Sequence, residues 1–102
     1  MQNHSYGIDL ESFYGLEAMA YDAFSQERPD VLHVFSAGNQ GLSIPASGIY
    51  QGIGPWSNLT GNMKMAKNVL VVGAVDSFGI SSDLASRGPA YDGRIKPELV
   101  TM

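Results

Sequence analysis

Apolar residues recur at intervals of three and four across residues 8–30 of the chain. This spacing predicts an amphipathic helix, because residues three and four apart fall on one helical face. The apolar stripe would consist of five residues: Leu10, Phe13, Leu16, Ala20 and Phe24. Asp9 suits the N-cap and Pro29 ends the helix, whereas Gly15 within it lowers helix stability by roughly 1 kcal/mol relative to alanine.

Two apolar runs further along the chain are continuous rather than periodic. The sequences VLHVFSAG at 31–38 and VLVVGAV at 69–75 are nearly unbroken, which is typical of strands covered on both faces. Between them lies a Gly-, Ser- and Pro-rich passage at 39–62, which is too long for an idle connector and is expected to be functional surface or an insertion. With a short polar strand at 3–7, the order of strand, helix, strand, long loop and strand predicts parallel pairing in an α/β architecture.

Composition and charge narrow the classes of function. The 102 residues suffice for one modest domain, and a hydrophobic fraction of 44% suits a folded globular protein. The net charge is −4 and the six cationic residues are scattered, which excludes a surface that attracts nucleic acid or anionic membranes. The absence of cysteine excludes disulfides and thiolate metal sites. No apolar run approaches the ~18 residues of a spanning helix, and any export signal is expected to lie outside this chain.

The titratable residues show no metal-site or paired-carboxylate pattern. The two histidines, His4 and His33, lack partners at ligand spacing and are interpreted as hydrogen-bonded residues in or beside strands. The aspartates are interpreted mostly as caps or solvated surface: Asp9, Asp22, Asp30, Asp76 and Asp83. The glycosylation sequon at 58–60 is a pattern that arises often by chance, so it carries no prediction.

A dinucleotide site is an alternative interpretation of the glycines after the first apolar run. Gly38 to Gly41 would cradle a phosphate and Asp76 would hold a ribose. The pattern is G-N-Q-G rather than G-x-G-x-x-G, and no helix clearly starts there. Asp76 also lies 35 residues past Gly41, where about 20 is usual, so a nucleotide-binding function is disfavoured.

Three stretches occur in an order that matches a known family. They are NHSYG at 3–7, VFSAGNQG at 34–41, and NVLVVGAVD followed by SRGPAYDGRIKPELV between residues 68 and 100. Together they resemble the middle of the catalytic domain of a subtilisin-like serine protease, or subtilase. Members of that family carry an Asn-x-Ser-x-Gly strand, a helix, a strand ending in Ala-Gly-Asn-x-Gly, a Val-Gly-Ala-Val-Asp strand and a Ser-x-Gly-Pro turn. The match covers residues 3–101, except a loop at 42–66 that is longer than in compact subtilisins.

The resemblance implies a fold and a domain assignment. It implies a three-layer α/β sandwich with a mainly parallel sheet, and it makes residues 1–102 a fragment of one subtilase catalytic domain. The family's Asp-Thr/Ser-Gly, His-Gly-Thr-His and Gly-Thr-Ser motifs, which hold the catalytic triad, are absent. We expect the triad segments to lie before residue 3 and after residue 101 in a longer parent. A serine without an aligned base is a poor nucleophile, so the isolated chain is expected not to hydrolyse peptides.

By the same resemblance, Asn39 donates its side-chain amide to the oxyanion of the tetrahedral intermediate, where charge develops only in the transition state. The competing interpretation is a turn asparagine in the left-handed conformation. The resemblance also assigns two walls of the primary specificity pocket: Ser5, Tyr6 and Gly7 on one side, and Ser36, Ala37 and Gly38 on the other. The backbone of the first wall would pair with an extended peptide, since every peptide offers the same N–H and C=O groups.

The resemblance also implies the partners. A peptide or protein substrate is expected, with no nucleic acid and no membrane, and the isolated chain is expected to self-associate through uncovered sheet edges and apolar faces. Most bacterial relatives are secreted or held in the cell envelope, and the same location is expected here. No cofactor is expected; calcium, common in subtilases, is left open for the parent, although the loop at 42–66 has no acidic residue. The rival function is a non-catalytic subtilase-like domain that binds peptides, and triad motifs in the parent gene would decide between the two.

Overall fold

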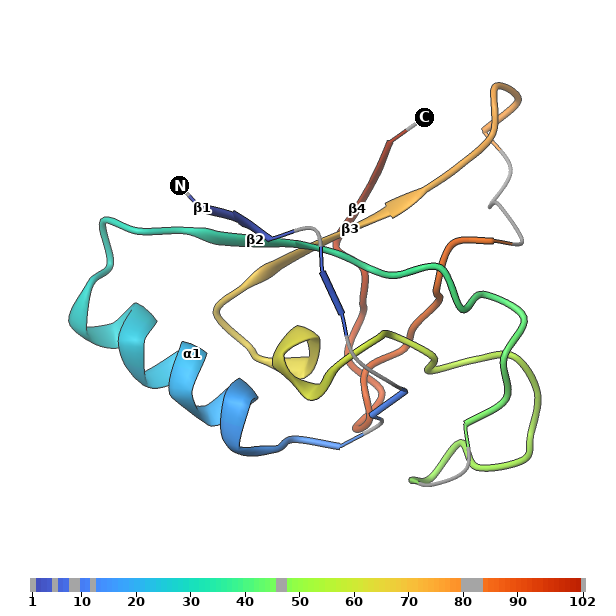
Figure 1. Cartoon of the computed structure of the whole chain (residues 1–102), viewed down its shortest axis with the longest axis horizontal. Helices are drawn as coiled ribbons and strands as arrows, with labels where there is room; N and C mark the ends of the chain where they lie inside the picture. The colour runs from blue at the N-terminus through green and yellow to red at the C-terminus, as the bar shows by residue number, and fades with distance from the viewer. Residues whose placement is uncertain are drawn as a thin grey trace.

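The computed structural model describes residues 2–4, 6–7, 10–11, 13–45, 48–79 and 84–101. Four short strands form one sheet in the order β1-β2-β3-β4 (Figure 1). The strands are β1 (Gln2–His4), β2 (His33–Ser36), β3 (Leu70–Ala74) and β4 (Leu99–Thr101). One helix, α1 (Leu16–Glu27), and one 3-10 helix, η1 (Asn62–Met65), complete the elements of the described residues.

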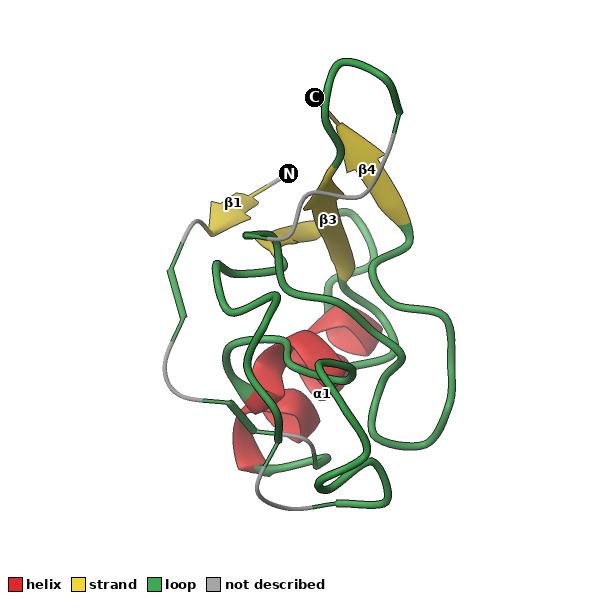
Figure 2. Cartoon of the chain, turned by 90° about the vertical axis from the view of Figure 1, so that its right-hand side faces the viewer, coloured by secondary structure: helices red, strands yellow, loops and turns green. Residues whose placement is uncertain are grey.

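All neighbouring strands are parallel. The register places His4 of β1 beside Phe35 of β2, and Ser36 of β2 beside Val72 of β3. Both helical segments lie below the sheet in Figure 1, and Figure 2 shows α1 on that same side. The predicted α/β class with a parallel sheet is therefore confirmed. Of the three expected layers, the described residues supply the sheet and the helical layer on one of its faces.

The two faces of the sheet are covered unequally. On the face toward α1, His33 and Phe35 are buried, and the centroid of the Tyr21 ring lies 5.1 Å from that of Phe35. On the opposite face, Val34 and Val72 are half-buried and line a cavity of about 510 Å³. The expectation that the strand at 31–38 is covered on both faces is therefore not met within the described residues. The continuous run reflects two apolar faces, of which one has a helical layer here.

The helix begins later than the apolar spacing predicts. α1 starts at Leu16 with Gly15 at its N-cap, so the prediction of a helix from residue 9 is wrong for the described residues before Leu16. Asp9, the predicted cap, lies outside the described residues. The actual cap is distant in sequence: the side-chain oxygen of Asn62 in η1 accepts a hydrogen bond from the Ala18 N–H at 3.0 Å. The predicted end is confirmed, since α1 stops at Glu27, shortly before the proline.

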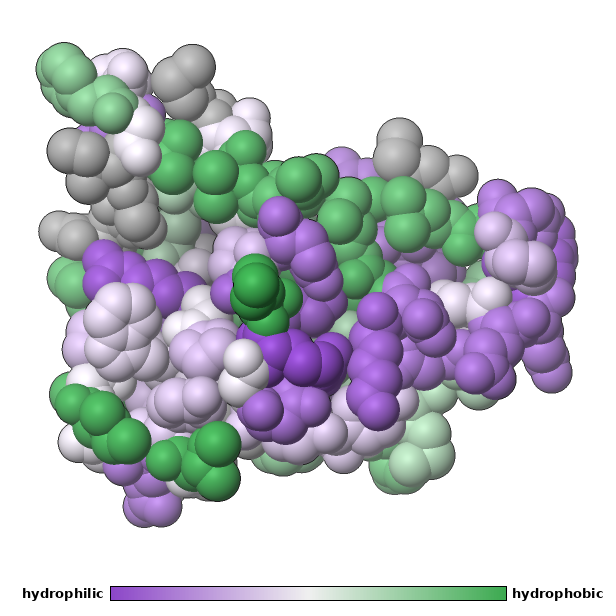
Figure 3. Space-filling view, turned by 180° about the vertical axis from the view of Figure 1, so that it is seen from behind, coloured by the Kyte–Doolittle hydropathy of each residue, from purple (hydrophilic) through white to green (hydrophobic). Residues whose placement is uncertain are grey.

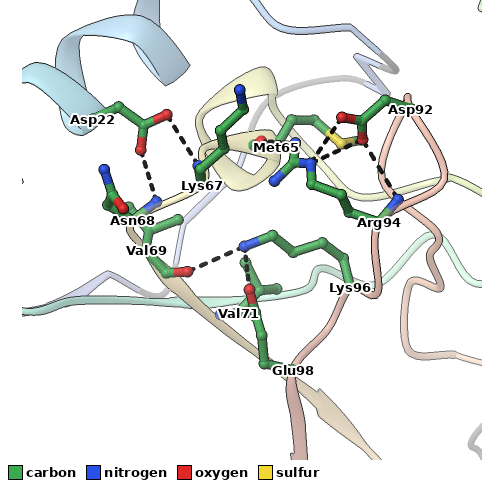
Figure 4. A network of polar contacts seen from close by, with 10 residues as sticks. All are labelled: Asp22, Met65, Lys67, Asn68, Val69, Val71, Asp92, Arg94, Lys96 and Glu98. Atoms are coloured by element: carbon green, nitrogen blue, oxygen red, sulfur yellow. Dashed lines mark hydrogen bonds and ion pairs between the residues drawn. The ribbon is translucent and has the colours of Figure 1, made fainter.

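The predicted apolar stripe of the helix is wrong as well. All of its five members except the first are exposed, and Leu16 is 79% exposed. The helix instead buries Ala18, a small residue that lets η1 approach, and Asp22. The Asp22 carboxylate accepts hydrogen bonds from the N–H groups of Lys67 and Asn68, at 3.0 and 2.7 Å (Figure 4). Asp22 is thus a buried structural carboxylate rather than solvated surface.

The core lies where the sequence predicted surface. All residues from 57 to 66 are buried, and Leu59, Met63 and Met65 pack in one cluster with Phe35 and Val71 of the sheet. The interpretation of the loop at 39–62 as surface or insertion is therefore wrong for its last six residues, 57–62. The polar residues of this segment misled the interpretation because hydrogen bonds inside the protein, rather than water, satisfy them.

The segment before β4 fixes the beginning of β3. The buried Lys96 donates a hydrogen bond from Nζ to the Val69 carbonyl at 3.1 Å and forms an ion pair with Glu98 (Figure 4). Glu98 also accepts a hydrogen bond from the Val71 N–H at 2.7 Å. Burial lowers the pKa of Lys96, and the Glu98 carboxylate opposes that shift. The Ile-Lys-Pro-Glu run thus ties β4 to β3 through charged groups.

Candidate active site

The ends of β1 and β2 bring the two predicted walls together. Parallel neighbours end at the same edge of a sheet, and His4 is paired with Phe35, so the segments that follow them emerge side by side. A cavity of about 200 Å³ lies between these segments. Its lining consists of Tyr6, Gly7, Ser36, Gly38, Asn39, Gln40, Thr60 and Lys64. Ser5 of the first predicted wall lies outside the described residues.

Thr60 lies against both walls and explains their glycines. A Cβ built on Gly7 would lie 2.8 Å from Thr60 Cβ, and one built on Gly38 would lie 2.7 Å from Thr60 Cγ2. Both are closer than real Cβ atoms approach, so any larger residue would force Thr60 to move. Gly38 also has a φ of +112°, a conformation that side chains rarely adopt. The two glycines therefore keep the cavity open around the Thr60 hydroxyl.

Asn39 lies at the rim of this cavity with its amide unused. The residue is exposed, and no hydrogen bond joins its side chain to any described residue. Among the described residues other than glycine, only Ser57 has a positive φ, so Asn39 is not in the left-handed conformation that the turn interpretation requires. Gly38 has the positive φ of the turn instead. The Asn39 side chain therefore stays available as a donor at the carboxyl end of β2.

Ser86 holds the loop that carries Asn39. Its hydroxyl accepts a hydrogen bond from the Gln40 N–H at 2.9 Å, and its own N–H donates to the Gly38 carbonyl at 2.9 Å. These two bonds bracket Asn39 on both sides. The sequence analysis included Ser86 only as part of the Ser-x-Gly-Pro turn and gave it no role. The signal that could have found it is the Ser-x-Gly-Pro turn itself, which accompanies Ala-Gly-Asn in the family.

Asn58 joins the same loop to the turn that follows Ser86. Its Nδ2 donates to the carbonyls of Gly41 and Ser43, both at 3.0 Å, and its Oδ1 accepts from the Arg87 N–H at 2.6 Å. The residue is fully buried, so the amide of the 58–60 sequon is committed to the fold. Sequence reasoning gave this asparagine no role.

Lys64 is a further residue of the site that sequence reasoning missed. Its side chain is buried, lines the cavity, and donates a hydrogen bond from Nζ to Thr60 Oγ1 at 2.7 Å. Burial lowers the pKa of Lys64 to about 8. In the sequence it is one of two nearby cations, and nothing in that pattern distinguishes it from the exposed Lys67.

The model of the subtilase family matches residues 1–102 of the sequence. The chain belongs to the subtilase family. The segment after β1, the Ala-Gly-Asn end of β2 and the Ser-x-Gly-Pro turn therefore meet at one end of a subtilase sheet. Membership of the family supports serine peptidase function in general.

Ala37 of this subtilase does not line the smaller cavity, unlike its two neighbours in the predicted wall. It is buried and lines the larger cavity on the opposite face of the sheet, with Ser36 and Gly38. Its N–H donates to the Val72 carbonyl at 2.9 Å, and its carbonyl accepts from the Thr60 N–H at 3.3 Å. Its backbone therefore anchors Thr60 beside the smaller cavity.

The two histidines of the subtilase chain bind each other. His4 Nε2 and His33 Nδ1 lie 3.0 Å apart, so one proton is shared between them, and the His4 ring stacks on Phe35 with centroids 4.7 Å apart. Burial, with a smaller contribution from His4, lowers the pKa of His33. The interpretation of both as hydrogen-bonded residues is confirmed. Within the described ranges there is no cluster of three or more metal-ligating side chains, and no helix is long and apolar enough to span a membrane.

Proposed function

We propose that this chain supplies the oxyanion-hole amide and the peptide-binding walls of a subtilisin-like serine endopeptidase. Membership of the subtilase family supports the general class of the reaction. The observation that carries the finer assignment is Asn39, whose exposed amide has no hydrogen-bond partner among the described residues and lies on the rim of the 200 Å³ cavity. We place the enzyme outside the cell or in the cell envelope, because subtilases are often secreted.

The chemistry of peptide hydrolysis requires a donor in this position. When a serine oxygen adds to the scissile carbonyl carbon, the carbonyl oxygen takes up negative charge. An N–H donor about 2.7–3.1 Å from that oxygen stabilises the tetrahedral state more than the substrate. The bonds from Ser86 to Gly38 and Gln40 hold the loop on both sides of Asn39, so the amide needs little reorganisation during the reaction.

The peptide would bind along the edge of the sheet at β1. β1 is the first strand in the sheet order, so the chain that continues it toward Tyr6 and Gly7 has one side without a strand among the described residues. An extended peptide can pair with such an edge through backbone hydrogen bonds, while one side chain enters the cavity between the walls. This arrangement supports binding of many sequences, with selectivity at the cavity.

The first prediction concerns Asn39 in the enzyme formed when the chain is expressed with the triad-bearing segments of its gene. Asn39→Ala should lower kcat by about 10²–10³-fold with little change in KM, the magnitude known for the oxyanion-hole asparagine of subtilisin. Gln40→Ala is the matched control, because this neighbouring amide contacts Ser43 on the same loop. It should change kcat by no more than about threefold. Equal losses in both variants, or a change confined to KM, would contradict the role of Asn39.

The second prediction concerns the isolated chain. Without an aligned base no serine of the chain is activated, so a fluorophosphonate probe should label none of its serines. Mass spectrometry after incubation measures this, with an intact subtilisin as the positive control. A labelled serine would show that the chain contains a working nucleophile. If the gene lacks the Asp, His and Ser motifs, peptide binding without hydrolysis, the rival function, takes the place of catalysis.

A further inference from the structure

A buried ammonium group borders the proposed peptide-binding cavity. Lys64 is 0% exposed yet belongs to the lining of the cavity, and its Nζ lies 2.7 Å from Thr60 Oγ1. Of the atoms around Gly7 and Gly38, this same hydroxyl oxygen would lie nearest to an added Cβ on either glycine. The ammonium is therefore one hydrogen bond away from the point where the two walls meet.

The charge of Lys64 has no counterion among the described residues. Thr60 is its single hydrogen-bond partner there, and no described carboxylate lies within ion-pair distance of Nζ. The carboxylates that reach η1 from the segments packed on it, Glu11 and Glu17, both bind Asn62 instead. An ammonium has three N–H donors, so two of them have no partner among the described residues. Burial of an unpaired charge is costly, which makes this group unusual in a structure where Lys96, the other buried lysine, has its own carboxylate.

We propose that Lys64 makes the cavity selective for a substrate side chain that ends in a carboxylate, that of aspartate or glutamate. The inference rests on the proposed peptide-binding function and names its substrate class. A carboxylate that enters between the walls accepts hydrogen bonds from the ammonium and supplies the missing countercharge, whereas a neutral amide supplies one oxygen and no charge. The net charge of −4 repels acidic peptides in general, so a preference for them can arise only from a local group such as Lys64.

The test compares two peptides that carry fluorescein on the N-terminal amine and differ in one functional group, Ala-Ala-Ala-Glu-amide and Ala-Ala-Ala-Gln-amide. The terminal amide removes a second carboxylate that could itself reach Lys64. Fluorescence anisotropy with the full chain at pH 7 should give about 10- to 100-fold tighter binding of the glutamate peptide. Lys64→Met should bind both peptides equally. Lys67→Met, which removes an exposed lysine three residues away, should keep the preference.

Each outcome separates the selectivity from the proposed function. Equal binding of the two peptides by the unmodified chain would overturn the role of Lys64 while leaving peptide binding intact. Binding of neither these peptides nor their phenylalanine and lysine counterparts would overturn both. A preference that survives in Lys64→Met, or disappears in Lys67→Met, would assign the selectivity to another group. The comparison in the unmodified chain needs no variant, so it stands even if Lys64→Met fails to fold.

Discussion

Lys64 reduces the stability of the folded chain because its charged side chain is buried beside the cavity. Burial lowers its pKa from 10.5 to about 8, so between these values the unfolded chain binds more protons and stability rises with pH. Lys64→Met should therefore stabilise the chain at pH 7 by on the order of 2–3 kcal/mol, and this gain should shrink as the pH approaches 10.5. Urea unfolding at pH 7 and pH 10 measures the effect, with Lys67→Met as the exposed control. A loss of stability in Lys64→Met at pH 7 would contradict the burial of an unpaired charge.

Ser86 positions Asn39 through hydrogen bonds to the backbone on both sides of it, and has no direct part in the proposed reaction. Ser86→Ala removes the acceptor of the Gln40 N–H, which should cost about 1 kcal/mol of unfolding free energy and speed hydrogen exchange of that amide. Ser43→Ala is the matched control, since its hydroxyl donates only to the exposed Gln40 side chain. NMR-detected exchange at Gln40 distinguishes the two. Unchanged protection in Ser86→Ala would show that the loop is held by other contacts.

At the level of single residues, the motif indicated the positions of the proposed site but not the residues that support them. Asn39 and Gly38 follow a strand in a recognisable pattern, so the sequence alone places them at a strand end. Thr60, Lys64 and Ser86 meet them only after folding, from segments more than twenty residues away. A polar residue in a polar stretch looks the same whether it is buried against a partner or dissolved in water, so local patterns could not identify these three.

At the level of elements, the chain shows why helix ends differ in predictability. The end of α1 depends on a local restriction, because the proline at 29 cannot continue the helix and disfavours helical geometry in the residue before it. Its start depends on Asn62, whose side chain caps the Ala18 N–H from 44 residues away. The same contact decides which helical face is buried, since η1 packs on the side of Ala18 and Asp22. Apolar periodicity alone pointed to a different face.

Two strands, β2 and β3, were predicted more closely than the helix because their apolar runs are long and end in glycine or turn signals. The polar strand predicted at 3–7 is only partly confirmed, since β1 spans Gln2–His4 and residues 6–7 are outside it. β2 and β3 lie inside the predicted runs, whereas no strand was predicted at 99–101, where β4 lies. β4 depends on the buried Lys96, whose ion pair with Glu98 fixes it beside β3. Charged residues in an exposed-looking run gave no indication of a strand, so this element required the tertiary structure.

At the level of the whole molecule, the sheet is a two-faced surface with a helical layer on one side. The face opposite α1 carries apolar residues such as Val34 and Val72, which explains the continuous apolar runs of the sequence. Seen from behind, hydrophobic side chains run in a band across the upper part of the molecule (Figure 3). Exposed apolar residues also follow the sheet at β4, where Leu99 and Val100 are both more than half exposed. The assignment of the chain as a fragment of one catalytic domain stays a prediction. The uncovered face agrees with it.

An uncovered edge and an uncovered apolar face lead to the last prediction, that the isolated chain pairs with a second copy of itself. β4 is an edge strand among the described residues, and its exposed valine and leucine favour strand pairing with another copy. Light scattering after gel filtration should give a mass that rises with concentration from 10.9 kDa toward twice that value. Val100→Lys places a charge on the edge and should shift the chain toward the monomer. Phe78→Lys, which changes an exposed aromatic in the turn after β3, should not. A monomer at every concentration would show that the edge and the face do not cause association. An equal shift in both variants would indicate non-specific apolar association.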